Sequence, residues 1–163
     1  MIQPRASSRK PVILTLIVGL TFTLMPLPES LDPFRPDWLA LLVIFWAMQL
    51  PRTWSIGTAW IIGLVLDVSQ GTLLGQHALA FCVVAFMTVR FHLLMRVFPL
   101  PQLTATVFGM LAVYQFLLFW INGVAGTHAA STVYWGPVIT GALFWPLLVM
   151  MLSGVRYQDR SGN

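Results

Sequence analysis

Six apolar stretches separated by short turns take up nearly all of the 163 residues of this chain. Apolar residues make up 58% of the sequence and charged residues only 9%, with a mean hydropathy of +0.81. A soluble globular domain carries roughly 25% charged residues, so this chain has too few to cover a surface that faces water. The sequence therefore predicts an all-α polytopic membrane protein, a six-transmembrane-helix bundle, in a single domain over residues 1–163.

Prolines and turn residues set the limits of the expected spans. A basic N-terminus precedes the first apolar stretch, but no small-x-small cleavage site follows, so we interpret this stretch as an uncleaved first span. A tight turn at Pro51 and Arg52 joins the second and third spans, which leaves a re-entrant hairpin as an alternative to two complete spans. The spans are predicted at residues 11–25, 37–50, 53–68, 72–94, 102–122 and 131–153.

The basic residues predict the orientation of the chain. An even number of spans puts both termini on one side, and cytoplasmic segments carry an excess of Lys and Arg. Cytoplasmic termini leave only Arg35 outside, and the basic residues then inside are Arg5, Arg9, Lys10, Arg52, Arg90, Arg96, Arg156 and Arg160. The net charge of +4 is thus explained by membrane orientation and by attraction to anionic lipid headgroups, which argues against a nucleic-acid partner.

The segment GLVLDVSQGTLLGQHAL is the most distinctive local feature, because it places an ionisable Asp67 near the outer end of the third span. Ionisable groups this close to a membrane interior are costly and usually face the bundle or a partner. One interpretation is a polar site lined by Asp67, Gln70, Gln76 and His77. The other is structural: Asp67 accepts backbone N–H bonds and fixes the turn, and the glycines let the helices close. The candidate site comprises Gly63, Asp67, Gly71, Gly75 and His77.

Enzymatic functions find little support in the sequence. A metal site needs several His, Cys or carboxylate ligands at suitable spacing, and His92 is expected on the opposite side of the membrane from His77 and His128. No serine lies in a hydrolase motif, and no glycine-rich phosphate loop is present. We therefore predict no catalytic residue, no metal and no cofactor. Cys82 lies within a span and is interpreted as a small packing residue.

Two pairs of small residues spaced four apart are expected to let helix backbones approach closely. They are Ala59 with Gly63 and Ala105 with Gly109. Each pair serves either packing inside the bundle or contact with a transmembrane helix of a partner.

Prolines and tryptophans give further expectations about the spans. Pro137 and Pro146 are expected to kink the last span. The tryptophans expected at the membrane interfaces are Trp38, Trp54, Trp120 and Trp135. Those expected to pack between helices are Trp46, Trp60 and Trp145.

Several features together resemble the bacterial rod shape-determining MreD family, in particular its proteobacterial branch. They are the basic start, an outer loop that ends in FRPDW, the GxxxDxxxGxxLG pattern, the basic turn RFHLLMRV, and the NG and FWPLL elements toward the end. The resemblance covers essentially the whole chain. The FRPDW element corresponds to Phe34, Arg35, Pro36, Asp37 and Trp38.

The resemblance implies a multi-pass protein of the bacterial inner membrane, in the elongation complex that builds side-wall peptidoglycan. Such proteins associate with MreC, and through it with the MreB filament and with RodA and PBP2, the glycan polymerase and transpeptidase. The implied fold is similar to the six-helix substrate-binding components of energy-coupling-factor vitamin transporters. No catalytic residues carry over from the family.

We therefore expect a non-enzymatic scaffold that binds the transmembrane helix of MreC and supports rod shape. The outer loop from Pro26 to Pro36 and the FRPDW element are candidate contacts. The alternative is a small-molecule binder similar to the vitamin-transporter components, with a polar pocket that would also use Asn122. A lipid-handling role is a third possibility. Copurification of MreC or of a small molecule would discriminate between the first two.

Overall fold

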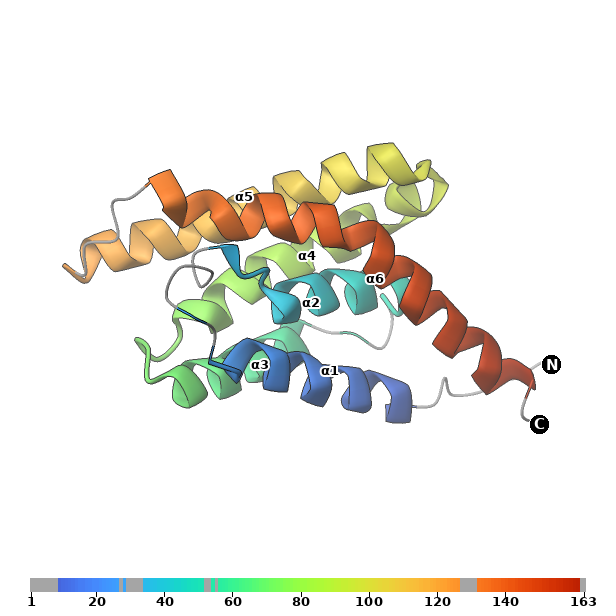
Figure 1. Ribbon diagram of the computed structural model, residues 1–163, viewed down its shortest axis with the longest axis horizontal. Coiled ribbons are helices and arrows are strands. Elements are labelled where there is room, and N and C mark those ends of the chain that lie inside the picture. Colours follow the sequence, from blue (N-terminus) through green and yellow to red (C-terminus); the bar gives the residue numbers. More distant parts are fainter. Residues whose placement is uncertain are drawn as a thin grey trace.

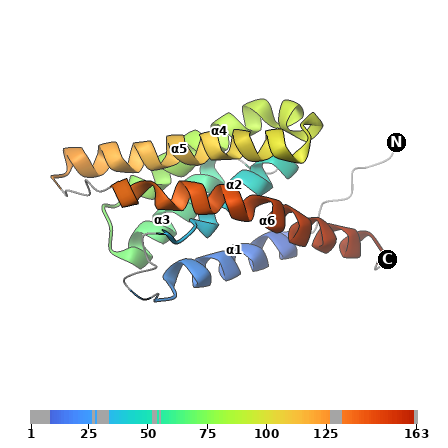
Figure 2. The same ribbon diagram turned by 45° about the horizontal axis from the view of Figure 1, so that its top comes forward.

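The computed structural model describes residues 9–26, 28, 34–51, 54, 56–126 and 132–161. Over these residues the chain is entirely helical, as predicted, and its elements are α1 (Arg9–Leu24), α2 (Trp38–Gln49), α3 (Ile56–Gln70), α4 (Gln76–Val97), α5 (Leu100–Val124), the short 3-10 helix η2 (Thr132–Trp135) and α6 (Gly136–Ser161). Successive α-helices alternate in direction, so α1 begins and α6 ends at the same end of the bundle (Figures 1 and 2).

The helices differ in length, which matters in a membrane. Three are long and apolar enough to cross one: α4 with 22 residues, α5 with 25, and α6 over residues 136–153. The apolar helices α1, α2 and α3 have only 16, 12 and 15 residues. At 1.5 Å per residue, α2 is about 18 Å long against a hydrocarbon core about 30 Å thick. The described residues thus contain the six expected helices, of which three have the length of a complete span.

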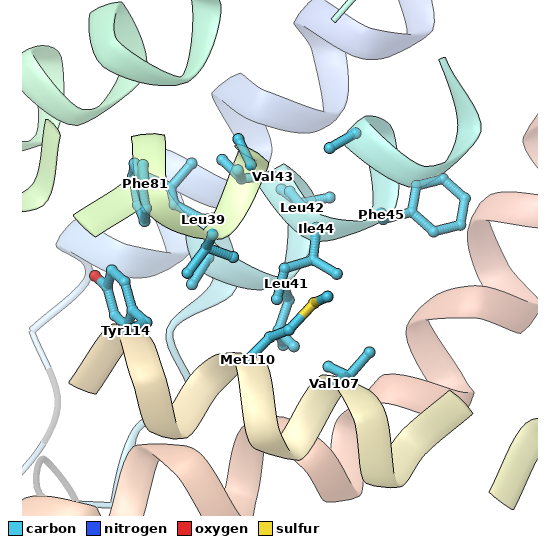
Figure 3. Packing of buried hydrophobic residues seen from close by; sticks show 14 of the residues in the cluster. Leu39, Leu41, Leu42, Val43, Ile44, Phe45, Phe81, Val107, Met110 and Tyr114 are labelled. Atoms are coloured by element: carbon cyan, nitrogen blue, oxygen red, sulfur yellow. The ribbon is translucent and has the colours of Figure 1, made fainter. Parts of the chain in front are cut away.

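The shortest α-helix, α2, lies at the centre of the bundle. Every residue from Leu39 to Met48 is buried, and the helix contacts α1, α4, α5 and α6. A helix that is apolar on all sides is stable only where other helices or lipid surround it. Figure 3 shows α2 side chains packed against Phe81 of α4 and against Val107, Met110 and Tyr114 of α5.

The two consecutive helices α2 and α3 do not pack together as a hairpin. α3 packs mainly on α4, with a smaller contact to α1, whereas α2 packs mainly on α4 and α1. The described parts of these helices therefore do not form the packed re-entrant hairpin that the sequence left open.

Glycine determines where α3 and α4 meet. A Cβ atom at Gly63 would lie 2.2 Å from the Ala78 Cα of α4, so no side chain fits there unless the helices separate. Ala59 is also fully buried. A Cβ at Gly109 would meet open space, and Ala105 is exposed. The first small-residue pair therefore packs inside the bundle, and the second faces outward.

The last helix departs from expectation at one of its two prolines. Pro137 is the second residue of α6, a position where proline is tolerated because the first N–H groups of a helix have no partner within it, so it does not kink the helix. Pro146 lies inside α6 and removes one backbone hydrogen bond. Figure 1 shows α6 changing direction along its length, as a proline in the interior of a helix would cause.

Two tryptophans lie elsewhere than the sequence suggests. Trp46 and Trp145 are buried, as predicted. Trp60 is 43% exposed, so the expectation that it packs between helices is wrong. Trp54 is only 5% exposed and packs into the core rather than at an exposed interface position. Distance from the end of a span does not tell which side of a helix meets its neighbours, and that side decides burial.

Candidate functional site

Asp67 is fully buried near the end of α3, where it binds the start of α4. Its Oδ2 accepts hydrogen bonds from the backbone N–H groups of Gly75 at 2.8 Å and Ala78 at 3.5 Å. Its Oδ1 accepts from the His77 N–H at 3.0 Å and from the Thr72 hydroxyl at 3.1 Å. The first N–H groups of a helix lack partners within it, and the helix dipole favours negative charge there. Asp67 therefore caps α4 from the neighbouring helix.

The same carboxylate positions the His77 ring. Nδ1 of His77 lies 2.7 Å from Oδ1 of Asp67, and His77 is buried. The ring centroid lies 6.4 Å from the rings of both Phe81 and Tyr114. His77 is therefore a packed interior residue that is also hydrogen-bonded.

The turn between α3 and α4 depends on two glycines. Gly71 has a φ of 64° and Gly75 a φ of 97°, in the left-handed region where a Cβ atom is strained. Gly75 also places its N–H on the Asp67 carboxylate. The glycine spacing noted in the sequence is therefore the spacing of a specific turn.

The structure brings the five candidate residues of this segment together around the α3–α4 turn, but not all of the wider polar set. Gln76 is buried at the start of α4, whereas Gln70 is exposed. Asn122 lies near the end of α5 and hydrogen-bonds to Tyr134. The structural interpretation accounts for the hydrogen bonds of both Asp67 oxygens, while a small-molecule site here stays a prediction.

Tyr114 of α5 connects this turn to the FRPDW element, and sequence reasoning missed it. Its hydroxyl donates a 2.5 Å hydrogen bond to Oδ2 of Asp37. Its ring stacks on Phe81, with centroids 5.4 Å apart. The signal in the sequence was the polar pair Tyr114–Gln115 in the middle of a mostly apolar span. Gln115 donates in turn to the Tyr134 carbonyl at 2.9 Å, which ties η2 to α5.

The two charged residues of FRPDW hold helix ends. Nη2 of Arg35 donates to the carbonyl oxygens of Phe22 and Met25, each at 2.5 Å, at the end of α1. Asp37 is the N-cap of α2 and accepts from the Ala40 N–H at 3.2 Å. Charge and hydrogen-bonding capacity both suit these ends, since a helix C-terminus attracts cations and an N-terminus attracts anions.

The remaining residues of FRPDW divide between surface and interior. Phe34 is 53% exposed. Trp38 is partly buried between Phe22 of α1 and Phe144 of α6, with ring centroids 5.9 and 5.5 Å away. Of the outer loop before this element, residues 27 and 29–33 lie outside the described residues.

A second arginine binds a helix end. Arg96, near the end of α4, donates to the Met48 carbonyl at 3.2 Å through Nε and to the Gln49 carbonyl at 2.7 Å through Nη2. It thus caps the C-terminus of α2, as Arg35 caps that of α1. A charge pattern along the sequence carries no sign of this role, because the acceptor carbonyls belong to another helix.

In the part of the chain that the structure describes, no three His, Cys, Asp or Glu side chains lie close enough to hold a metal ion. His128 lies outside the described residues. Cys82 is half-buried, and its Sγ donates to the Ile56 carbonyl at 3.5 Å.

Comparison with known proteins gives two matches. The family of the rod shape-determining protein MreD matches residues 9–155. The rod shape-determining protein MreD of Haemophilus influenzae is 24% identical over 143 residues, which cover 86% of each chain. No solved structure matches.

Proposed function

The chain belongs to the rod shape-determining MreD family, and we propose that it acts as a non-enzymatic membrane scaffold of the bacterial elongation complex. The family that the sequence features indicated is thus confirmed, and with it a role in rod-shape determination. The proposal extends this role to binding MreC and, through MreC, to assembly with MreB, RodA and PBP2 during side-wall peptidoglycan synthesis.

This proposal rests on what the charged side chains contact. Arg35, Asp37, Asp67 and Arg96 each hydrogen-bond to a helix end, so their chemistry fixes the bundle. What the bundle offers outward is mainly apolar helix surface, which suits contact with lipid and with other transmembrane helices.

We place the transmembrane helix of MreC on α5. Ala105 and Gly109 are exposed one turn apart, and open space lies beyond Gly109. Small residues let two helix backbones come close in lipid, where packing rather than the hydrophobic effect drives association. Phe108 and Phe116, 44% and 55% exposed, would flank the approaching helix.

Substitution of Gly109→Leu tests this placement, with Gly123→Leu as its matched control. Both glycines are exposed on α5 and have no neighbour within 4 Å of an added Cβ, so neither change strains the bundle. Gly109→Leu should lower copurification of MreC about fivefold, the effect of losing roughly 1 kcal/mol, while Gly123→Leu, about four turns further along at the end of α5, should have a much smaller effect because crossed helices diverge there. Equal recovery of MreC with both variants, at equal protein levels, would remove this face from the interface.

The outer loop is a second candidate contact for MreC. Reversal of the charges of Arg35 and Asp37 would disturb the ends of α1 and α2, so it cannot report on binding alone. Phe34→Ser changes an exposed side chain instead, and it should weaken MreC recovery without lowering the melting temperature.

The topology belongs to the same proposal: six spans in the bacterial inner membrane, both termini in the cytoplasm, and a fold similar to the vitamin-transporter components. The alternating helix directions support an even number of crossings (Figure 1). Mass spectrometry of the affinity-purified protein separates the scaffold from the small-molecule binder. MreC without a ligand supports the scaffold, and a retained ligand without MreC would overturn it.

A further inference from the structure

α3 covers only the first part of α4 on one flank of the bundle. The Sγ atom of Cys82 lies 3.5 Å from the carbonyl oxygen of Ile56, the first residue of α3. Cys82 is in the second turn of α4, which continues to Val97, so about 22 Å of α4 extends past this point. α3 therefore does not cover this part of the flank.

The uncovered flank combines apolar side chains with one cation. Residues four, eight, eleven and fifteen positions after Cys82 share its face of an α-helix, and here they are Phe86, Arg90, Leu93 and Val97. All four are exposed, Phe86 by 56%, Leu93 by 69% and Val97 by 82%. The surface that runs from the start of α3 to the end of α4 is thus apolar except at Arg90.

Arg90 differs from Arg35 and Arg96, which both bind helix ends. Arg96, on the same helix, donates to the carbonyls at the end of α2. Neither of the two acidic side chains that the structure describes pairs with Arg90, since Asp37 binds Tyr114 and α2, and Asp67 binds α4. The Arg90 guanidinium is therefore available to bind an anion from outside the chain.

The position of Arg90 along α4 matches the depth of one leaflet. Arg90 lies about 10 Å before the end of α4, and a long side chain can extend its charge from there to the headgroup level. The level of Ile56 and Cys82 lies about 12 Å deeper, close to half of a hydrocarbon core about 30 Å thick. The part of the uncovered flank below Arg90 is thus about as deep as the acyl chains of one leaflet.

We propose that this flank binds an anionic phospholipid of the leaflet at the α4 C-terminal end. The Arg90 guanidinium pairs with the phosphate, whose geometry accepts two parallel N–H bonds. An acyl chain lies along Leu93 and Phe86 and ends where Ile56 begins α3. This site is separate from the α5 face placed against MreC and holds whether or not MreC binds there.

Native mass spectrometry of the purified full chain tests the site, with phosphatidylglycerol and phosphatidylcholine of identical acyl chains as probes. The wild type should retain phosphatidylglycerol over phosphatidylcholine. Arg90→Gln should lower the apparent affinity for phosphatidylglycerol about fivefold and that for phosphatidylcholine less, because the choline cation already offsets the charge of its phosphate. Lys10→Gln removes the same charge from an exposed position on α1, at the same end of the bundle, and should change neither.

Two outcomes would overturn the proposal. One is an equal loss of phosphatidylglycerol in both variants, or a loss in neither, because binding would then not depend on Arg90. The other is displacement of the lipid by millimolar inorganic phosphate, which would make this a site for free anions. A third variant tests the acyl part: Leu93→Gln places an amide on the chain's path and should weaken both lipids together, and unchanged retention would contradict that path.

Discussion

At the α3–α4 turn, the Asp67 carboxylate accepts hydrogen bonds that water would otherwise accept. Leu73 and Leu74 in this turn are 55% and 68% exposed, so the turn presents apolar side chains outward. Irregular backbone is tolerated near hydrocarbon only when its polar groups are satisfied within the protein. The Asp67 carboxylate satisfies N–H groups of the turn and of the start of α4, and its own backbone carbonyl accepts from the Thr72 N–H at 3.1 Å.

Replacement of this carboxylate should destabilise the bundle more, the fewer of its acceptor oxygens the new side chain keeps. Asp67→Asn keeps one acceptor oxygen and loses the other, whereas Asp67→Ala leaves several buried donors without a partner. We expect a loss of about 3 kcal/mol for Asp67→Ala and an intermediate loss for Asp67→Asn, measured by thermal unfolding in detergent. Gln70→Ala, on the exposed side of the same helix end, should stay within about 0.5 kcal/mol of the wild type.

The same variants separate a structural Asp67 from a ligand site. If the role of Asp67 is structural, the ability of each variant to restore rod shape to cells that lack the protein should fall in proportion to its loss of stability. Asp67→Asn protein with an unchanged melting temperature that fails to restore rod shape would contradict this role and favour a site.

Tyr114 offers a test of a single hydrogen bond. Tyr114→Phe keeps the ring stacked on Phe81 and removes the donor to Asp37. The expected cost is about 1 kcal/mol of unfolding free energy, while Tyr114→Ala should cost about 3–5 kcal/mol, because it also empties a buried volume. Equal melting temperatures for wild type and Tyr114→Phe would show that the hydrogen bond contributes nothing net.

At the scale of the helices, the same pair of small residues spaced four apart packs in two different ways. Ala59 with Gly63 and Ala105 with Gly109 are identical in type and spacing. Only the first pair meets another helix, because α3 crosses α4 at Gly63 with backbone against backbone. The pattern permits a close approach but does not say which helix approaches, or whether that helix belongs to the same chain.

Alanine at the two glycines should therefore shift stability in opposite directions. Gly63→Ala places a Cβ against the Ala78 backbone and should cost about 1–3 kcal/mol through separation of α3 from α4. Gly109→Ala meets open space and should stabilise α5 by about 0.5–1 kcal/mol, since alanine favours the helix. Both are read from melting temperatures in detergent, and a shift of the same sign for both would contradict the packing described.

At the scale of the whole molecule, the neighbouring helices separate the central helix α2 from the surroundings of the bundle. α2 is too short to cross a bilayer alone, yet it is buried along its length by α1, α4, α5 and α6. Its two ends are capped by Asp37 and Arg96, so neither end leaves its backbone groups to the lipid. A short helix is stable in this place because its neighbours, not the bilayer, form its surroundings.

The alternating directions predict which loops face each side of the membrane. In a background with Cys82→Ala, the cysteine of Gln102→Cys, in the first turn of α5, should react with a membrane-impermeant maleimide only from the cytoplasm. A cysteine at Ala125→Cys, just after α5, should react only from outside. Labelling of both from one side would contradict the six-span topology.

Much of the fold could be predicted because hydropathy and helix breakers are properties of each segment alone. The all-helical class, the six helices and the family follow from apolar runs, prolines and short polar patterns such as FRPDW. The turn glycines Gly71 and Gly75 were also found, since a turn is local.

Only the tertiary structure decided which surfaces meet. In it, α2 lies at the centre and Tyr114 hydrogen-bonds to Asp37. Arg96 binds the end of α2, and Gly63 faces inward whereas Gly109 faces outward. Each of these depends on the neighbour that a side chain meets across the bundle. In a chain that is apolar nearly throughout, the sequence marks almost no difference between a face that meets lipid and a face that meets another helix.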